Sequence, residues 1–309
     1  MSQGRTIYFL EEKNMKKVLA VLLALVMVLS LAACGGNGGE TTTAAEGDTT
    51  AAATEAKVKL VDVKLTDEDY AFGIDKDQPE LLENVNTFIA KIMKDGTFDE
   101  ICNKYFGDGT PTPVTSATED SSKEQLVVAT NAQFPPFEYM EGDSYYGIDM
   151  EIADLLAKEL GMELVISNMK FDAVCLSVGQ HKCDIAMAGL TVNEKRKEQV
   201  TFSDSYYQAS QMIITKADDT TFDACKDAAA AEAILKGFDS TKKIGYQNGT
   251  TDQYYVKGDA DWGFDGLAVT GQGFDNGALA VQDLINGNID YVMIDAAPAG
   301  RIVDTYNGK

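Results

Sequence analysis

Residues 126–166 of the chain read LVVATNAQFPPFEYMEGDSYYGIDMEIADLLAKELGMELVI, and this stretch decides the fold class. It opens with the apolar run Leu126–Ala129 and closes with a second one, Leu164–Ile166. Between the two runs, apolar residues recur at helical spacing, and Gly161 follows as the kind of residue that ends a helix. A strand, a helix and another strand in this order predict two parallel strands with a helix on the face of their sheet.

The same alternation of strand-like and helix-like segments continues toward the C-terminus. Asp149 stands where it would cap the first helix, and residues 278–286 have the pattern of a later one. Further strand-like runs are Asp184–Ala188, Gln211–Thr215, Lys243–Tyr246 and Tyr291–Ile294. This pattern predicts an α/β fold built from parallel sheets with helices on their faces.

Residues 57–107 carry a second set of elements. Apolar alternation predicts strands at Lys57–Val63 and Tyr70–Ile74. Helical spacing predicts a helix over Glu80–Lys94, which ends at Gly96. The region is therefore expected to fold, and it needs neighbouring elements to cover its apolar faces.

A second helix is predicted directly after Gly96. Thr97 and Glu100 have the spacing of a capping box. The helix would bury Phe98, Ile101, Tyr105 and Phe106. Residues 108–124, which contain two prolines, many Ser and Thr and no apolar pattern, predict a loop or linker.

The composition argues against several classes of function. The length of 309 residues suggests about two domains. Acidic residues number 49 against 26 basic ones, and an acidic chain is a poor partner for nucleic acid or anionic lipid, which attract basic patches. The only histidine, His181, lies in a polar turn and is expected at the surface. We therefore expect no catalytic residues, no metal site and no cofactor.

The cysteines do not indicate a metal site either. None of the five forms a CxxC pair or a cluster with histidine. Cys102 and Cys175 occupy apolar helix positions and are expected in the core. The sequence does not decide whether Cys183 and Cys225 are paired.

The N-terminus has the features of an export signal. Lys16 and Lys17 precede the apolar run Val18–Leu31. As a helix, this run reaches about 21 Å, which is short of the roughly 30 Å of a bilayer's hydrocarbon core. We predict a signal peptide region over residues 1–33 rather than an ordinary buried helix, with Met15 as the natural start and residues 1–14 as an upstream start or a tag.

The end of this apolar run resembles the cleavage box of bacterial lipoproteins. Residues 31–35 read LAACG, with small residues before a cysteine. The resemblance implies a lipid on Cys34, which would anchor an extracytoplasmic protein to the bacterial cell membrane. Residues 34–56 are rich in Gly, Thr and Ala and predict a flexible linker between anchor and fold.

From residue 126 onward the chain resembles the polar amino acid substrate-binding proteins of ABC importers, the family 3 extracellular solute-binding proteins. The matching stretches occur in the family's order and spacing. They are Thr130–Glu138, Gly147–Ile152, Asp184–Thr191, Glu194–Lys197, Phe202–Tyr207, Gly245–Thr251 and Ile289–Ala296.

The segments that end the family's chains stand at the front of this one. Asp69–Ile74, Leu81–Ile92 and Asp95–Gly107 resemble the strand and the two helices with which the family ends. The order implies a circular permutation in which residues 108–124 join the old termini. Such a join is cheap when the termini lie close together, because loop closure costs only about 0.6 kcal/mol per doubling of length. A partial duplication with a truncated tail is the alternative.

The resemblance implies a two-lobe fold of the type II periplasmic-binding-protein kind with two hinge strands. Lobe 1 would contain residues 68–107 and 125–211. Lobe 2 would contain residues 57–67 and 212–309. The hinges are expected near residues 65–68 and 209–211.

The resemblance also implies a site for a free amino acid. Arg196 matches the family's clamp for the ligand carboxylate, since a guanidinium grips both oxygens at once. Asp295 matches the carboxylate that receives the ammonium group. The amide of Thr191 opens a short predicted helix that continues to Lys197, and free amides there suit an anion. The Thr191 hydroxyl and the Gly189 carbonyl are expected to hold the ammonium group.

Further positions imply donors and specificity. Phe134 and Phe171 match side-chain pocket walls, whereas Phe137 is assigned a supporting role. Asn131 replaces the acid that receptors for basic amino acids often carry, which favours a neutral polar ligand. The remaining expected contacts are Thr250, Thr251 and Gln247.

The function that these features predict is capture of a free, polar amino acid outside the cell and its delivery by a monomeric protein to an ABC transporter permease. A dehydratase-like enzyme on the same fold is the first alternative, with Glu138 or Asp172 as a general acid. No nucleophile–base pair is evident, so we expect a binding protein and not an enzyme. A ligand-sensing module is the second alternative, and it would need a transmembrane helix and a signalling domain.

Overall fold

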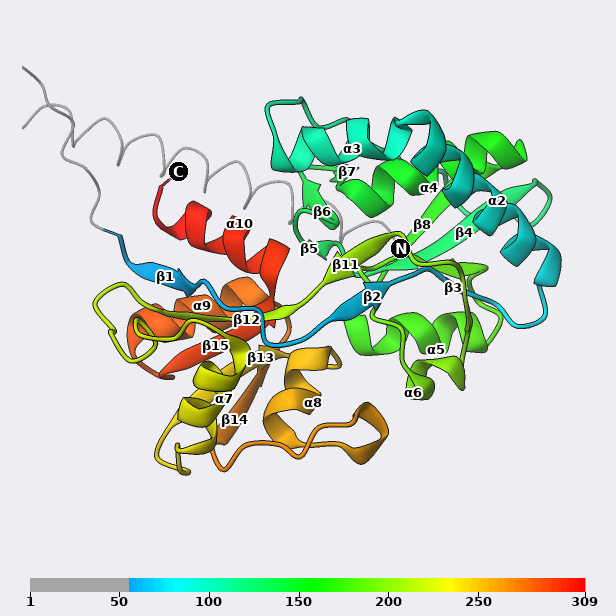
Figure 1. Ribbon diagram of the computed structural model, residues 1–309. Coiled ribbons are helices and arrows are strands. Elements are labelled where there is room, and N and C mark those ends of the chain that lie inside the picture. The colour runs from blue at the N-terminus through cyan, green and yellow to red at the C-terminus, as the bar shows by residue number, and fades with distance from the viewer. Residues whose placement is uncertain (1–55, 309) are drawn as a thin grey trace, which may run out of the picture. The chain divides into compact units, whose positions relative to one another are not determined.

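The computed structural model describes residues 56–308 (Figure 1). The predicted signal region 1–33, the lipidation site Cys34 and the tether up to residue 55 lie outside the described residues. Among residues 56–308, no helix combines the length and the apolar character that crossing a membrane requires.

One five-stranded sheet forms the centre of what we call lobe 1. Its strands lie side by side in the order β10 (Thr201–Phe202), β3 (Gly73–Ile74), β9 (Ile185–Ala186), β4 (Gln125–Thr130) and β8 (Glu163–Asn168). β4 runs parallel to both β8 and β9, as the sequence predicts. β3 runs antiparallel to β9 and to β10.

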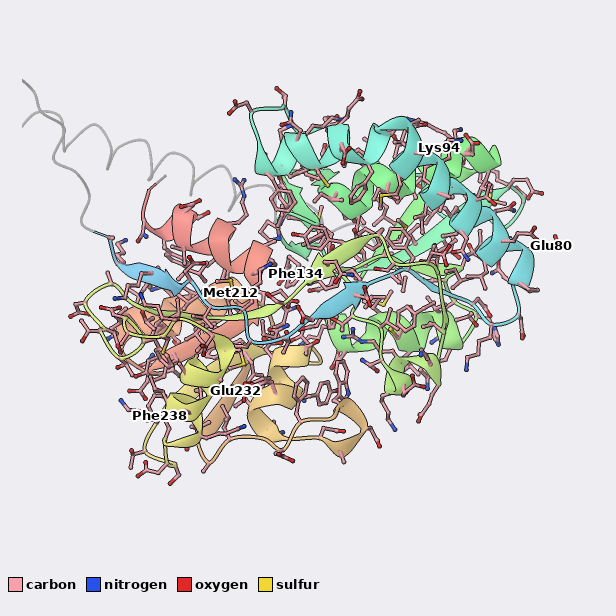
Figure 2. All side chains as sticks on the ribbon, in the orientation of Figure 1. Glu80, Lys94, Phe134, Met212, Glu232 and Phe238 are labelled. Atoms are coloured by element: carbon pink, nitrogen blue, oxygen red, sulfur yellow. The ribbon has the colours of Figure 1, made fainter. Side chains whose placement is uncertain are left out.

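Helices and a small three-stranded sheet complete lobe 1. Helix α4 contributes Ile152 and Leu156 to the core, and α2 contributes Val85 and Ile89. Figure 2 labels Glu80 and Lys94 near the two ends of α2. The elements are α2 (Pro79–Asp95), α3 (Thr97–Phe106), α4 (Ile148–Leu160), α5 (Val174–Gly179), α6 (Glu194–Lys197), the 3₁₀ turn η1 (Phe171–Ala173), β5 (Gln133–Phe134), β6 (Glu138–Glu141) and β7 (Ser144–Tyr146).

A second five-stranded sheet forms the centre of lobe 2. Its order is β1 (Val58–Val61), β12 (Gln211–Lys216), β15 (Tyr291–Asp295), β13 (Lys243–Gln247) and β14 (Thr270–Phe274). β13 runs parallel to β14 and β15, whereas β12 runs antiparallel to β1 and β15. Its helical elements are α7 (Ala228–Lys236), α8 (Thr251–Lys257), α9 (Gly277–Asn286), α10 (Ala296–Tyr306) and the 3₁₀ turn η2 (Ala260–Trp262).

The predicted parallel pairs are present in both sheets, and antiparallel strands that the local patterns did not indicate complete them. The antiparallel strands belong to two chain segments that run from one sheet into the other. One segment carries β1, β2 (Glu68–Tyr70) and β3, and the other carries β10, β11 (Tyr207–Ala209) and β12. β2 and β11 pair antiparallel with each other, and Figure 1 shows this two-stranded ribbon between the two sheets.

The predicted strand over Tyr70–Ile74 is in fact two strands. The chain interrupts its pairing at Ala71 and Phe72, because β2 pairs with β11 and β3 pairs with β9 and β10. Ala71 and Phe72 are both buried. The apolar pattern therefore continues through the break between the two strands and does not indicate it.

Two predicted helix caps are wrong. Gly96, at φ 86°, both ends α2 and precedes α3, so Thr97 is the first residue of α3 and has no room to act as its cap. The Thr97 amide instead donates to Asp95 Oδ1 over 3.0 Å. Gly147 is the cap position of α4, and Asp149 lies inside its first turn with its carboxylate buried.

The predicted loop over residues 108–124 contains no helix. Its only pairing among the described residues is an isolated bridge between Val114 and Tyr145 of β7. Val114 is buried, and the amide of Ala117 donates to the carbonyl of Leu164 at 2.8 Å. The loop therefore lies along lobe 1 and does not hang free.

Candidate functional site

Residues from both lobes meet at one carboxylate, Glu68 of β2. The hydroxyl of Thr191, in lobe 1, donates to Glu68 Oε2 over 2.7 Å, and the hydroxyl of Thr251, at the start of α8 in lobe 2, donates to the same oxygen over 2.8 Å. The two hydroxyl oxygens lie 3.2 Å apart. Glu68 therefore joins the lobes at the crossing ribbon.

The second oxygen of Glu68 is equally well occupied. Oε1 accepts from the hydroxyl of Thr66 at 2.6 Å and from Nε2 of Gln211 at 3.0 Å. The side chain is buried, and all four donors are neutral groups. Four donors use the acceptor positions that an ionised carboxylate offers.

Arg196 lies in the same region and contacts both lobes. Nη1 donates to the carbonyl of Thr191 at 2.8 Å, and Nη2 donates to the carbonyl of Gly249, which precedes α8, at 3.2 Å. The guanidinium carbon lies 5.2 Å from the ring centre of Phe171 and 5.0 Å from that of Trp262, so aromatic rings of both lobes hold it by cation–π contact.

The backbone before Arg196 differs slightly from the prediction. Helix α6 begins at Glu194, and the side chain of Asn193 caps it by accepting from the Arg196 amide at 2.8 Å. Thr191 precedes this helix and forms a bridge to Tyr70. Its amide therefore does not open the helix as predicted.

Asp295 ends β15 on the lobe 2 side of the ribbon. The hydroxyl of Tyr70 donates to Oδ1 over 2.6 Å. Burial, and then the negative charge of Glu68, raise the pKa of Asp295 to about 7, although hydrogen bonds from Tyr70 and Gln211 act in the opposite direction. The Asp295 carboxyl therefore changes its charge near neutral pH.

Arg196 and Asp295 belong to one network. No hydrogen bond among the described residues joins the two side chains directly. The path runs from Arg196 to the Thr191 backbone, from the Thr191 hydroxyl to Glu68, and from Glu68 to Gln211, whose Cα is the register partner of that of Asp295. The structure thus brings the predicted cation and the predicted anion to the same meeting point of the lobes.

Two amides touch across the lobes beside this network. Gln247 Nε2, at the end of β13, donates to Asn131 Oδ1 over 3.2 Å, and Asn131 Nδ2 donates to the carbonyl of Met169 at 2.6 Å. Thr250 is turned inward, and its hydroxyl donates to the carbonyl of Gln247 at 2.8 Å. Both amide side chains are buried.

Gly189 is required by its surroundings. Its φ of +53° lies in the left-handed region, and a Cβ there would come within 3.1 Å of the Phe134 ring and 3.2 Å of the Tyr70 ring. Its amide donates to Asp149 Oδ2 at 2.9 Å. Figure 2 labels Phe134 near the crossing ribbon, where it stacks on Phe137 with ring centres 6.2 Å apart.

Two pockets open at the Phe171 side of the site. One, of about 220 Å³, is lined by Arg196, Phe171 and Trp262, together with Tyr254 and Leu176. The other, of about 370 Å³, lies between Lys170 to Asp172 of lobe 1 and Asn248, Gly249, Gln253, Tyr254 and Asp275 of lobe 2. The predicted residues Phe171 and Arg196 therefore border open space.

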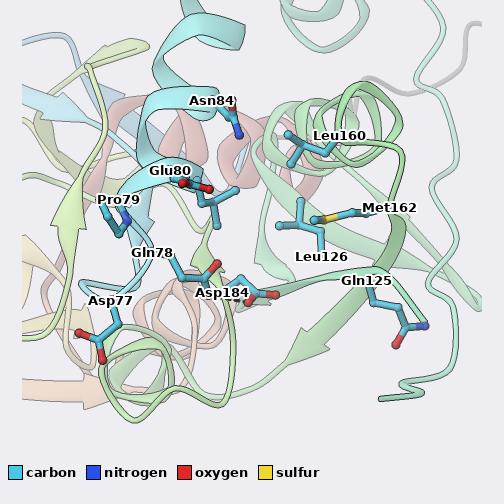
Figure 3. A pocket seen from close by; sticks show the side chains of 11 residues that line it. Asp77, Gln78, Pro79, Glu80, Asn84, Gln125, Leu126, Leu160, Met162 and Asp184 are labelled. Carbon is cyan, nitrogen blue, oxygen red and sulfur yellow. Dashed lines mark hydrogen bonds between the residues drawn. The ribbon is translucent and has the colours of Figure 1, made fainter. Parts of the chain in front are cut away.

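A third pocket, of about 510 Å³, lies within lobe 1 between the start of α2 and strand β4 (Figure 3). Gln78 Nε2 donates there to Asp184 Oδ1 at 2.7 Å. None of the predicted ligand contacts lines this pocket.

Three more buried carboxyl groups lie near the site. Glu138 is fully buried, and neither of its oxygens has a hydrogen-bond partner in the described part of the chain. Burial, and then the charges of Asp149 and Asp295, raise its pKa well above the usual range. Burial raises the pKa of Asp149 to about 7, and burial with the charge of Asp295 raises that of Asp252.

His181 lies at the surface, as predicted, with 58% of its side chain exposed. Its Nδ1 lies 2.7 Å from Asp75 Oδ2, and its Nε2 lies 3.7 Å from Asp77 Oδ2. Within residues 56–308 this trio is the one group whose ligand-type atoms lie close enough to share an ion, and only Asp75 is buried.

The predicted core cysteines are only partly buried. Cys102 packs against the main core of lobe 1, and Cys175 packs against its second core beside α5. Cys183 is buried, and none of the four described cysteines is in a disulfide.

Sequence reasoning missed Glu68, Gln211 and Trp262. Glu68 stands in the acidic run Asp67–Asp69, which looks like solvated surface. The available signal was the alternation of the strand, because Glu68 and Tyr70 point to one buried face while Asp69 points outward. No sequence pattern marked Trp262.

Comparison with known proteins places the chain in a family. The model of the bacterial extracellular solute-binding proteins, family 3, matches residues 4–108 and 126–294. The arginine-binding extracellular protein ArtP of Bacillus subtilis is 37% identical over 134 residues, which are 43% of this chain and 48% of that protein. The chain thus spans about half the length of this relative.

Solved structures agree on the fold. An ancestral arginine-binding protein bound to arginine is 34% identical and superposes with a TM-score of 0.50 over 59% of this chain and 75% of that one. The ancestral amino acid-binding protein AncCDT-1, a precursor of cyclohexadienyl dehydratase, is 29% identical with a TM-score of 0.51 over 59% of this chain and 74% of that one. The fold is the two-lobe, type II periplasmic amino-acid-binding fold, and the chain belongs to the family 3 bacterial extracellular solute-binding proteins.

Proposed function

We propose that this protein captures a free amino acid between its two lobes outside the cell and delivers it to an ABC transporter permease. The observation that carries the proposal is the network at the crossing ribbon. It gathers a guanidinium from lobe 1 and a carboxylate from lobe 2 around hydroxyls of both lobes. A zwitterion needs a cation for its carboxylate and an anion for its ammonium group, and contacts from both lobes reward closure.

In this proposal Arg196 binds the ligand carboxylate. Two of its five N–H groups donate to the carbonyls of Thr191 and Gly249, which leaves the others for a bidentate grip. The backbone amides of Thr250 and Thr251, where α8 begins, add donors from lobe 2. Asp295, with the Thr191 hydroxyl and the Gly189 carbonyl, receives the ammonium group.

The ligand side chain is proposed to be polar and uncharged. Asn131 and Gln247, the amides that touch across the lobes, support this choice, with Phe134 and Phe171 as apolar walls. An amide pair offers both donors and acceptors, which suits an amide or hydroxyl side chain. The relatives named for arginine binding point instead to a longer, cationic side chain.

Titration calorimetry with the twenty amino acids tests both parts. We expect L-glutamine or another neutral polar amino acid to bind most tightly. Preferential tight binding of arginine or lysine would overturn the side-chain assignment and leave amino acid capture intact. Absence of binding by every amino acid would overturn the function itself.

We further propose that the ligand leaves the protein unchanged. AncCDT-1 is described as a precursor of cyclohexadienyl dehydratase, and this description is the observation that favours the enzymatic alternative. Against it, Glu138 is enclosed without a hydrogen-bond partner among the described residues. Mass spectrometry of the bound small molecule after long incubation distinguishes the two, since any turnover product would establish an enzyme.

We also propose the circular permutation and the two-part lobes that the sequence implies. The ends of the described chain are hydrogen-bonded to each other, which supports the proposal. The Lys57 amide donates to Asn307 Oδ1 at 2.9 Å, and Asn307 Nδ2 donates to the Val58 carbonyl at 2.9 Å. A gene in which residues 57–107 follow residue 309, with residue 108 first so that the packed loop 108–124 is kept, should therefore give a protein with unchanged affinity. Failure of that protein to fold would count against the permutation.

The anchor and the monomeric state remain proposals of the same kind. Cleavage before Cys34 and its acylation would anchor the protein to the membrane through its new N-terminus. Mass spectrometry of the membrane-extracted protein tests this, because a lipidated N-terminal cysteine adds a defined mass. Recovery of an unmodified Cys34 in a bacterial host with lipoprotein processing would contradict it, and light scattering tests the monomer.

A further inference from the structure

We propose, building on the amino acid function above, that Glu68 is a second carboxylate of the ammonium subsite, beside Asp295. By accepting the hydroxyl protons of Thr191 and Thr251, Glu68 makes these hydroxyls act toward a ligand as hydrogen-bond acceptors and not as donors. Neither the family comparison nor the sequence assigns a role to Glu68.

The first argument is the direction of the hydrogen bonds. A threonine hydroxyl has one proton and two lone pairs. The Thr191 hydroxyl lies 2.7 Å and the Thr251 hydroxyl 2.8 Å from Glu68 Oε2, which is ideal for donation to a carboxylate. With their protons held by Glu68, the two hydroxyls present only lone pairs to a ligand. They therefore select a donor such as ammonium and reject a carboxylate oxygen.

The second argument is charge. Glu68 and Asp295 are both buried, and each interacts with Gln211. No ion pair among residues 56–308 includes either of them. The guanidinium of Arg196 contacts two carbonyls and two aromatic rings, and neither of these carboxylates. Buried like charges without a counter-charge are costly. An entering ammonium group offsets that cost, whereas a neutral or anionic group adds to it.

The third argument is position. Glu68 lies on the crossing ribbon. Its hydroxyl partner Thr191 belongs to lobe 1, and its hydroxyl partner Thr251 belongs to lobe 2. Only when the lobes are together do both hydroxyls reach the same oxygen. The acceptor pair thus exists in the closed arrangement, so recognition of the ammonium group and closure are one event.

The test compares an amino acid with its partner that lacks only the α-amino group. L-glutamine and glutaramate form such a pair, as do L-arginine and guanidinovalerate if arginine proves the tighter ligand. Calorimetry gives the ratio of the two affinities for the native protein and for Glu68→Gln. The amide of the variant keeps the size of the side chain, removes its charge and adds N–H donors toward the hydroxyls.

We expect the native protein to prefer the amino acid by at least 100-fold, and Glu68→Gln to reduce this ratio by at least 10-fold. A purely structural Glu68 would weaken both ligands equally and leave the ratio unchanged, which would overturn the inference. Glu151→Gln is the matched control, because Glu151 is a buried glutamate of α4 that accepts from the Tyr105 hydroxyl at 2.8 Å within lobe 1. Its substitution should leave the ratio unaltered.

Proton release provides a second readout, which also serves if Glu68→Gln folds poorly. The ionisable groups whose charges reach Asp295 are Glu68 and Tyr70 of β2, Glu138 of β6, Tyr207 of β11 and Asp252 of α8. Because the pKa of Asp295 is about 7, the carboxyl is about half protonated at pH 7, and ammonium binding should expel up to about half a proton per protein there. Calorimetry in buffers of different ionisation enthalpy measures this number.

The number of protons released should fall in Glu68→Gln and be retained in Glu68→Asp, which preserves the charge. Equal proton release in all three proteins would overturn the inference. If the native protein binds no amino acid at all, the proposed function fails first. If it binds and the ratio does not move, only the role of Glu68 fails.

Discussion

At the scale of single residues, the site depends on groups whose shape matters as much as their charge. Arg196 bridges two carbonyls of different lobes and lies between two aromatic rings. A lysine ammonium is a point charge that cannot reproduce this planar set of contacts. Charge alone therefore does not define the position.

Replacement of Arg196 by lysine should lower amino acid affinity about 100-fold, because roughly 3 kcal/mol is at stake in a bidentate, charge-assisted contact. The melting temperature should change by only a few degrees. Calorimetry and thermal unfolding measure the two quantities. Arg301→Lys, on the exposed side of α10, is the control and should change neither. Near-native affinity of Arg196→Lys would mean that the ligand carboxylate lies elsewhere.

Asp149 should make the stability of the protein depend on pH. Its folded pKa of about 7 lies above its unfolded value, because burial raises it by more than the hydrogen bonds from the Gly189 amide and the Tyr206 hydroxyl lower it. The protonated form is therefore favoured by folding. The free energy of unfolding gains a contribution as the pH falls from about 8 toward 4 and loses it as the pH rises through 7.

Asp149→Asn should reduce that slope by up to about 1.4 kcal/mol per pH unit, the value for one proton. Urea unfolding at several values of pH between 5 and 8 measures it. Asp154→Asn, on the partly exposed side of the same helix, should leave the slope as it is. A slope that survives in Asp149→Asn would assign the titration to other buried acids, such as Asp295.

At the scale of elements, the junction of α2 and α3 depends on one backbone angle. Gly96 separates the helices with φ 86°, and a Cβ at this position would meet nothing within 4 Å. The conformation, not the space, therefore demands glycine. Gly96→Ala should lower the free energy of unfolding by about 1 kcal/mol, since a left-handed conformation costs alanine that much.

Chemical denaturation measures the effect, and Gly300→Ala supplies a control of opposite sign. Gly300 lies inside α10 with open space around it and no left-handed angle. Alanine there should stabilise the protein by roughly 0.5–1 kcal/mol. Equal effects at both positions would show that the angle at Gly96 is not decisive.

The elements that the sequence predicts correctly are those with a long apolar pattern of their own. Strands β4, β8, β12 and β13 and helices α2, α4 and α9 are confirmed within a few residues. Strands such as β5, β7 and β10 consist of two or three residues and owe their existence to a neighbour. Local patterns carry no information about such pairing. The Asp149 error is of another kind, because a capping acid and a buried acid at a helix start look alike in sequence.

The site was predictable only where a motif carried it. The resemblance identified Arg196, Thr191, Thr251 and Asp295, and the structure brings all four into one network. Glu68 has no such motif. Its burial follows from the pairing of β2 with β11, whose paired residues Asp69 and Gln208 are 139 positions apart in the sequence. A local sequence pattern contains no information about pairing over such a separation.

At the scale of the whole described fold, the lobes are also joined by exposed polar contacts of the segment Asp275–Asn276. Asn276 Nδ2 of lobe 2 donates to Gln133 Oε1 of lobe 1 at 2.6 Å, and Lys170 Nζ lies 3.2 Å from Asp275 Oδ1. These exposed contacts are individually weak, worth about 0–1 kcal/mol each. These two contacts therefore add little to the cost of separating the lobes, which lies mainly in the buried contacts of Glu68, Arg196 and Asn131.

The Trp262 ring has a practical consequence. It is the chain's single tryptophan, it stacks on Tyr254 at 4.3 Å between ring centres, and it covers the guanidinium of Arg196 from the opposite lobe. Indole emission shifts to the red when water replaces such neighbours. The protein thus contains its own fluorescent probe. The emission maximum of Trp262 should shift to shorter wavelength when an amino acid binds and the lobes close, and it should not shift in Arg196→Ala.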